Sequence, residues 1–223
     1  MILGDKRAIM DGKPTHTGKN CMVHQHKPLI LASSSPRRQE LLAGLGVRYV
    51  VHKPNVDETP IANEAPLVYV QRLSQAKAHA VAQAQVGQSV LAADTVVILS
   101  ADTMGISADG DILGKPADAE EARAMLRALR GRAHVVCTAF TLLGDFAPYT
   151  QAVQTVVTMR DYDDAEIEAY IATGDPFDKA GSYAIQHEVF RPVARLEGSY
   201  SNVVGLPIDE VRAALIAHGV IRA

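Results

Sequence analysis

The sequence predicts an α/β or α+β protein built around a mixed β-sheet. Apolar runs of strand length alternate with amphipathic helical segments from about residue 28 onward, which is the pattern of a layered fold. One run, Val90–Leu99, is almost continuously apolar, as in a strand covered on both faces. Two others, His134–Leu143 and Gln151–Met159, are rich in β-branched residues and joined by a loop with Gly144 and Pro148, which is typical of an antiparallel pair. We therefore expect parallel and antiparallel strands in one sheet, in two lobes that meet near residue 130.

Length and composition place the chain among ordinary globular proteins. Its 223 residues are 48% hydrophobic and 21% charged, with a mean hydropathy of +0.02. The net charge of −3 argues against a nucleic-acid partner, so any phosphate binding must be local. No apolar run approaches the roughly 20 residues of a membrane span. Cys21 and Cys137 form neither a disulfide framework nor a zinc motif, which favours a reducing compartment, the cytoplasm.

The first 27 residues have a different character from the rest. They lack hydrophobic periodicity and contain no apolar core of a secretory signal, so we expect a flexible N-terminal extension or a misassigned start codon, with a transit peptide as the minor alternative. His24-Gln25-His26 resembles part of a metal site, but a solvated segment explains it more simply. Residues 28–223 are then expected to form a single catalytic domain.

Two strands and two helices are expected in the first 85 residues. The strands lie over Pro28–Ser33 and around Arg48–His52, and the helices over Pro36–Leu45 and from Pro66 to about Gln85. Gly44 and Gly46 supply the stop of the first helix. In the second helix Val70, Leu73, Lys77 and Val81 share one face. Lys77 therefore lies on an apolar face, where a solvated lysine is not expected.

The second half begins with a hairpin and continues with helices and the antiparallel pair. Asp109-Gly110 marks a turn that leads to a return strand near Ile112-Leu113. Helices are expected over Ala117–Arg130, Asp163–Thr173 and Pro207–His218, the last with proline in its first turn. The stretch from Asp178 to Gly205 is rich in glycine and is expected to be irregular.

The segment from Ser33 to Arg38 indicates an anion-binding site. Ser35 suits a helix N-cap, which places Arg37 and Arg38 in the first turn, where the helix dipole disfavours cations by up to about 1 kcal/mol each. A phosphate at the N-terminus would meet backbone N–H groups, the Ser33 and Ser35 hydroxyls and the guanidinium donors together. The alternative is that the arginines extend into solvent or pair with Glu40.

Asp94 is the strongest single catalytic candidate in the sequence. It interrupts the apolar run, and a carboxylate in a buried strand is costly unless it is paired or binds a cation. Thr95 faces the opposite side of such a strand unless the strand ends there, so its role is less secure. The alternative for Asp94 is a buried salt bridge with Lys77 or Lys115.

Three further motifs carry weaker signals. Gly114-Lys115-Pro116 does not satisfy the Walker pattern; it is either a plain turn or a rigid turn from which Lys115 reaches a phosphate. Asp57-Glu58 lies in an acidic loop that becomes a Mg²⁺ ligand only beside phosphates. The small residues from Asp178 to Gln186 allow close approach to a flat ligand, and the Gln186 amide offers a donor and an acceptor to a base edge.

Other catalytic classes lack their motifs. No G-x-S-x-G surrounds Ser199 or Ser201, and neither H-E-x-x-H nor G-x-G-x-x-G occurs. His134, within an apolar run, is interpreted as a core histidine.

A series of short motifs occurs in a fixed order. They are Ser33-x-Ser35-Pro36-Arg37-Arg38, Asp57-Glu58, Lys77, Ala93-Asp94-Thr95-Val96-Val97, Gly114-Lys115-Pro116, Asp178-Lys179-Ala180-Gly181-x-Tyr183-x-Ile185-Gln186 and Val204-Gly205-Leu206-Pro207. In this order and spacing, over roughly residues 28–218, they resemble the Maf family of nucleoside triphosphate pyrophosphatases. Each motif alone is common, but their joint occurrence is specific.

The resemblance implies a nucleotide cleft between two lobes, a divalent metal (Mg²⁺ or Mn²⁺) and cleavage of a triphosphate to a monophosphate and pyrophosphate. It implies Asp94 as proton acceptor, with Glu58, Lys77 and Lys115 as further active-site groups, and Arg37, Thr95 and Gln186 as specificity residues. Arg37, with Asp94-Thr95 and the stretch from Asp178-Lys179-Ala180-Gly181 to Ile185-Gln186, resembles the dTTP/UTP branch of the family. Asp175 and Phe177 depart from the family's common Glu and Leu. A homodimer is also expected.

The mechanism expected from these residues is direct hydrolysis. Cations from Arg38, Lys77 and Lys115 neutralise the triphosphate, Arg37 helps to select thymine or uracil, and Glu58 and Asp94 hold the metal while Asp94 activates water. The expected role is house-cleaning of nucleotide pools, with modified pyrimidine nucleotides as further substrates. The alternatives are a 7-methyl-GTP or ITP-type pyrophosphatase, or a nucleotide-binding regulator of septum formation.

Overall fold

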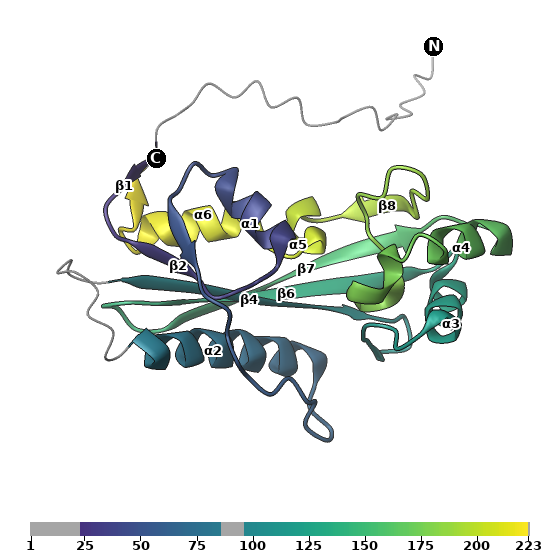
Figure 1. The fold of residues 1–223 in the computed structure, drawn as a ribbon, viewed down its shortest axis with the longest axis horizontal. Coiled ribbons are helices and arrows are strands. Elements are labelled where there is room, and N and C mark those ends of the chain that lie inside the picture. Colours follow the sequence, from purple (N-terminus) through teal and green to yellow (C-terminus); the bar gives the residue numbers. More distant parts are fainter. Residues whose placement is uncertain (1–22, 86–95, 223) are drawn as a thin grey trace, which may run out of the picture.

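The computed structural model describes residues 23–85 and 96–222. Within these two ranges, no helix has the length and apolarity needed to cross a membrane. The described chain folds around one large sheet, with helices on both faces and a small second sheet that joins the two ends of the described region (Figure 1).

The large sheet is mixed, as the sequence predicts. Its order is β3-β2-β4-β6-β7-β8, and β5 pairs with one end of β4. β2 is parallel to both β3 and β4, whereas all other pairs are antiparallel. The strands are β2 (Leu29–Leu31), β3 (Tyr49–Val51), β4 (Val97–Ile106), β5 (Ile112–Leu113), β6 (Ala133–Leu143), β7 (Tyr149–Met159) and β8 (Val193–Glu197).

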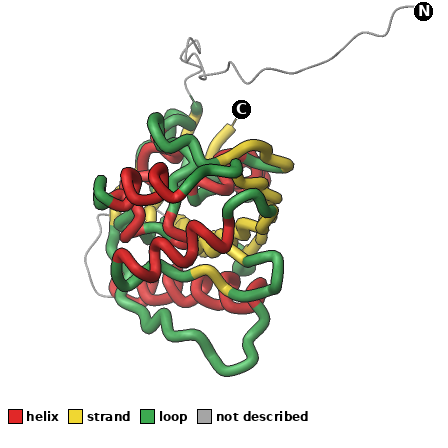
Figure 2. The backbone as a smooth tube through the Cα atoms, turned by 90° about the vertical axis from the view of Figure 1, so that its right-hand side faces the viewer, coloured by secondary structure: helices red, strands yellow, loops and turns green. Residues whose placement is uncertain are grey.

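Helices cover the sheet from both sides. Figure 1 shows α2 along one face of β4, β6 and β7, with α1, α5 and α6 on the opposite face and α3 and α4 at one end. Figure 2 shows the loop between β3 and α2, residues 52–65, projecting from the body. The helices are α1 (Pro36–Ala43), α2 (Pro66–Gln85), α3 (Ala119–Leu129), α4 (Asp164–Ile171), α5 (Tyr200–Val204) and α6 (Ile208–Ala217).

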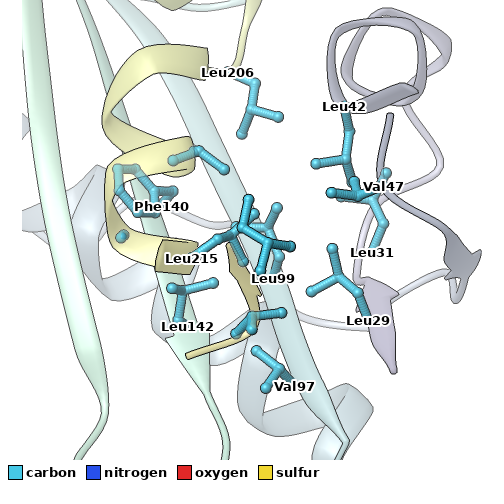
Figure 3. Packing of buried hydrophobic residues seen from close by; sticks show 14 of the residues in the cluster. Leu29, Leu31, Leu42, Val47, Val97, Leu99, Phe140, Leu142, Leu206 and Leu215 are labelled. Carbon is cyan, nitrogen blue, oxygen red and sulfur yellow. The ribbon is translucent and has the colours of Figure 1, made fainter. Parts of the chain in front are cut away.

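Apolar clusters hold these layers together. Leu31 and Leu99 of neighbouring strands pack with Leu42 of α1, with Leu206 between α5 and α6, and with Leu215 of α6, and all five side chains are fully buried (Figure 3). On the other face, Val70, Leu73 and Val81 of α2 are buried as the helical spacing predicts. Burying a leucine side chain contributes about 1.5–3 kcal/mol, so these clusters fix α1 and α2 relative to the strands that carry the site.

The predicted helices and hairpin are confirmed, but one strand has a different extent. Residues 90–95 of the strand expected over Val90–Leu99 lie outside the described residues, and β4 continues to Ile106. The apolar pattern does not predict that the strand continues to Ile106, because Ser100 and Asp102 interrupt the apolar run. In the structure both are buried and partnered: the Ser100 hydroxyl donates to the Ser74 carbonyl, and Asp102 accepts from Lys77.

The stretch expected to be irregular contains a β-strand and an α-helix. β8 pairs antiparallel with β7, and α5 has Ser199 as its N-cap, whose hydroxyl accepts from the Asn202 N–H. Five-residue elements show too few periods for a sequence pattern to identify them. Both depend on tertiary pairing.

The N-terminal part of the described chain is also paired. Strand β1 (His24–Gln25) forms an antiparallel pair with β9 (Ile221–Arg222). The extension expected over residues 1–27 therefore ends in a strand, while residues 1–22 lie outside the described residues. The two lobes expected to meet near residue 130 stay a prediction.

Candidate active site

A cavity opens at an unpaired section of the β4 edge. β2 pairs with β4 as far as Leu99, and β5 pairs with it from Gly105, so that no described strand covers the edge between them. Consecutive side chains of a strand point to opposite faces, yet Asp102 and Thr103 both line this opening. The cavity has a volume of about 620 Å³, which is within the range of small-molecule sites.

Charged groups converge at the α2 side of the cavity. The Lys77 ammonium lies 2.6 Å from an Asp102 carboxylate oxygen and 3.0 Å from a Glu58 carboxylate oxygen. Lys77 and Asp102 are buried, whereas Glu58 comes from the exposed projecting loop. A buried lysine needs a partner, and here the partner of Lys77 is a carboxylate on the neighbouring strand. The expectation that Lys77 is not solvated is met, and its buried partner is Asp102, a residue that the sequence analysis did not single out.

Helix α1 begins at Pro36, as the sequence predicts, and its first turn lines the cavity. Ser35 is the N-cap and its hydroxyl accepts from the Arg38 N–H. Arg38 turns inward, where Nε donates to the Gly205 carbonyl at 2.8 Å and the guanidinium also meets the hydroxyls of Thr103 and Ser33. Burial lowers the pKa of Arg38, and the Asp102 carboxylate opposes this shift. Arg38 neither extends into solvent nor pairs with Glu40; it ties α1 to β4 and to the turn after α5.

Arg37 and Asp178 meet across the cavity mouth, with a distance of 3.4 Å between guanidinium and carboxylate. Asp178 ends the short 3₁₀ helix Asp175–Asp178 and is held by Lys179. The Lys179 ammonium has three donors, and the Asp175 carbonyl, the Asp175 carboxylate and the Asp178 carboxylate accept from it at 2.6, 2.8 and 2.6 Å. Because all three donors are occupied, Lys179 stabilises the loop from Asp175 to Asp178 and so positions Asp178.

One part of the cavity wall, called the apolar end below, is formed by one hydrophobic cluster. Leu113, Val136, Ile185 and Val203 line the cavity and belong to this cluster or pack against it, and Gln186 is also a lining residue. Two buried polar side chains, His134 and Tyr183, also lie here, and His134 Nε2 is 2.8 Å from the Tyr183 hydroxyl. The interpretation of His134 as a core histidine is correct for its burial but omits its place in the cavity wall.

Comparison with known proteins shows the family to which this chain belongs. The family model "Maf-like protein" matches residues 28–218. The chain belongs to the Maf family. Curated relatives named "dTTP/UTP pyrophosphatase" include proteins from Myxococcus xanthus, 50% identical over 84% of this chain and 90% of the relative, and from Geotalea uraniireducens, 44% identical over 90% of this chain and 100% of the relative. A solved Staphylococcus aureus Ham1 protein covers 86% of this chain and 100% of its own, at 14% identity and a TM-score of 0.48.

In this Maf chain two residues expected in the site, the proton acceptor Asp94 and the specificity residue Thr95, lie outside the described residues. Their roles therefore stay predictions. The cavity wall instead contains Asp102 and Thr103. The signal that could have found them is a repeat: Ala93-Asp94-Thr95 recurs as Ala101-Asp102-Thr103, and the second copy immediately precedes the hairpin that leads to Gly114-Lys115-Pro116.

The structure brings the other expected site residues together and adds Lys53. Ser33, Ser35, Arg37, Arg38, Glu58, Lys77, Lys115, Asp178, Lys179 and Gln186 all line the cavity. Lys53, in the loop after β3, joins them as an exposed cation. It lies in a segment without any motif, and only the fold brings it to the cavity.

The carboxylates in this Maf site fit the divalent cation implied by the resemblance. Glu58 and Asp102 approach the same Lys77 nitrogen from two elements, so both face one point of the cavity. Mg²⁺ is commonly bound by one or two carboxylates with substrate oxygens completing its shell. The described residues contain no group of three or more His, Cys, Asp or Glu that could hold a metal alone. The donor set therefore fits a cation that arrives with a phosphate substrate.

Proposed function

We propose that this Maf protein hydrolyses dTTP and UTP to the monophosphate and pyrophosphate. The observation that carries the proposal is the buried Lys77–Asp102 pair, joined by Glu58, in the wall of a cavity that is also lined by an apolar cluster and by Gln186. Such a cavity offers one end to phosphates and the other to a flat base. The curated relatives named dTTP/UTP pyrophosphatase support this choice of substrate.

The triphosphate is assigned to the end where the cations gather. Lys115 and Lys53 are exposed, line the cavity and have no ion-pair partner among the described residues, so they are available to phosphate oxygens. Arg38 contributes its fixed charge from behind, because three of its N–H groups already bind protein oxygens. The first turn of α1, with the Ser33 and Ser35 hydroxyls, borders the same end.

Asp102 is assigned the role of proton acceptor. Its carboxylate is held at 2.6 Å by Lys77, which fixes its orientation in the wall. It takes a proton from a water whose oxygen attacks the α-phosphorus; the bond from that phosphorus to the bridging oxygen breaks, and pyrophosphate leaves. Glu58 and Asp102 would hold a divalent cation, which would supply positive charge beside the phosphate oxygens. No covalent intermediate is needed.

The base is assigned to the apolar end. Gln186 offers a donor and an acceptor to the edge of a uracil or thymine ring, and Arg37, held by Asp178, lies at the mouth. Thr103 is fixed by Arg38 and Thr138, so its position is rigid. Gln186, Arg37 and Thr103 are the residues that we propose select the base.

A substrate panel tests the proposal. The purified protein with Mg²⁺ is incubated with dTTP, UTP, CTP, ITP and 7-methyl-GTP, and both products are quantified. We expect equal amounts of nucleoside monophosphate and pyrophosphate from dTTP and UTP. Orthophosphate as the sole phosphate product refutes the reaction. Preference for ITP or 7-methyl-GTP refutes the substrate, and binding without turnover favours a nucleotide-binding regulator.

A further inference from the structure

Tyr183 and His134 form a buried hydrogen-bonded pair in the apolar end of the cavity. The Tyr183 hydroxyl lies 2.8 Å from His134 Nε2, and the two rings are perpendicular with centroids 5.4 Å apart. Only 7% of Tyr183 and 2% of His134 is exposed, yet both line the cavity. Within residues 23–85 and 96–222, His134 is the one hydrogen-bond partner of this hydroxyl.

The environment of His134 decides the direction of this hydrogen bond. Burial lowers the pKa of His134 to about 4, so its ring is neutral at pH 7 and carries one donor and one acceptor. Its Nδ1 atom is buried and has no partner within the described residues. If Tyr183 donated to Nε2, Nδ1 would carry the proton and a buried N–H would be stranded, and stranded donors are rarer than bare acceptors. Nε2–H therefore donates to the Tyr183 oxygen.

A tyrosine hydroxyl that accepts from His134 keeps its own proton for another acceptor. A phenol has one donor and two acceptor lone pairs, and His134 occupies an acceptor position. Burial raises the pKa of Tyr183 above its usual range, so the hydroxyl stays protonated at neutral pH. The pair thus presents a neutral donor to the cavity.

We infer that Tyr183, aimed by His134, donates a hydrogen bond to a ring carbonyl oxygen of a pyrimidine nucleotide. The inference rests on the proposed function and deepens it. Leu113, Val136 and Val203 line the cavity and belong to, or pack against, the same apolar cluster as Tyr183, so they offer apolar contact to a ring. Uracil and thymine present carbonyl, N–H and carbonyl along one edge. Gln186 matches the N–H and one carbonyl, and Tyr183 matches a carbonyl.

Sulfur analogues of the substrate test this hydrogen bond. Sulfur accepts hydrogen bonds more weakly than oxygen, so the wild-type protein should hydrolyse either 2-thio-UTP or 4-thio-UTP with a kcat/KM about fivefold below that for UTP, the factor that corresponds to one hydrogen bond of about 1 kcal/mol. In Tyr183→Phe the kcat/KM for UTP should fall about fivefold and the penalty for that analogue should vanish. His134→Leu should reduce the penalty, and His134→Gln, which retains an N–H donor, should restore part of it.

A matched control separates this role from a loss of stability. Tyr162 is also buried, but its hydroxyl donates to the Leu126 carbonyl outside the cavity, so Tyr162→Phe should keep the full analogue penalty. A wild-type protein that treats both analogues like UTP overturns the inference without any variant, and so does a penalty that survives in a folded Tyr183→Phe. Absence of UTP hydrolysis by the wild type refutes the proposed function itself.

Discussion

Replacing Asp102 with asparagine removes the proposed proton acceptor and leaves the side-chain shape unchanged. The amide cannot take a proton from water, and loss of a general base lowers kcat by about 10²–10⁴. The change also leaves Lys77, which is 7% exposed, with Glu58 as its one carboxylate neighbour among the described residues. Breaking a buried pair costs about 3–5 kcal/mol, and Glu58 at 3.0 Å offsets part of this. We therefore expect a melting temperature lowered by several degrees.

Asp94→Asn is the matched control for Asp102→Asn, because it makes the same chemical change in the other Ala-Asp-Thr sequence. Pyrophosphate release from UTP is measured for both variants at saturating substrate, and thermal melting checks that each is folded. We expect Asp94→Asn to retain activity within a few fold of wild type. If Asp94→Asn abolishes turnover and Asp102→Asn does not, the assignment of the proton acceptor to Asp102 is wrong and the sequence-based choice of Asp94 is right.

Three further perturbations follow from the contacts of the site. Arg38→Lys keeps a charge but loses the forked contacts to Gly205 and Thr103. We therefore expect a UTP turnover about tenfold lower in the activity assay and a free energy of unfolding lower by about 1–3 kcal/mol in urea titration. Wild-type values would contradict the proposal that Arg38 ties α1 to β4. Lys179→Met removes the hydrogen bonds that hold Asp175 and Asp178, so Arg37 loses a fixed partner in Asp178. We expect KM for UTP to rise more than kcat falls. An unchanged KM would show that Lys179 does not position Arg37. The pKa of His134 is about 4 in the folded protein and about 6.5 in the unfolded chain. As the pH falls, His134 is therefore protonated in the unfolded chain before it is protonated in the folded protein. The free energy of unfolding of the wild type should fall by about 3 kcal/mol between about pH 6.5 and pH 4. In His134→Gln that part of the pH dependence should be absent, which chemical denaturation across this range would measure.

Local periodicity predicts most elements because it depends on neighbouring residues alone. The spacing of Val70, Leu73 and Val81 is enough to predict α2 and its buried face, and Ser35 with Pro36 predicts the start of α1. Elements with a local polar interruption or few residues are different. β4 extends through Asp102 because Lys77 neutralises the carboxylate, and that lysine lies on a helix separate in sequence.

The candidate site shows the same division. Ordered motifs predict the Maf family and most of the residues that line the cavity, and the comparisons confirm the family. The repeat of Ala-Asp-Thr makes two residues equal as candidates when only the local sequence is considered. The tertiary structure favours the second copy, because it places Asp102 against Lys77 and Thr103 against Arg38 in the site.

From the sequence alone, the Ser33–Arg38 segment determined a helix start with two arginines, and the apolar face of α2 determined an inward lysine. Only the tertiary structure decided what these charges do. Arg38 turns inward because the Gly205 carbonyl lies within reach, Arg37 faces Asp178 across the cavity mouth, and Lys77 meets Asp102 at an open strand edge. The physical reason is that charges are satisfied by partners brought together through packing, and those partners here are separated by 25 to 167 residues along the chain.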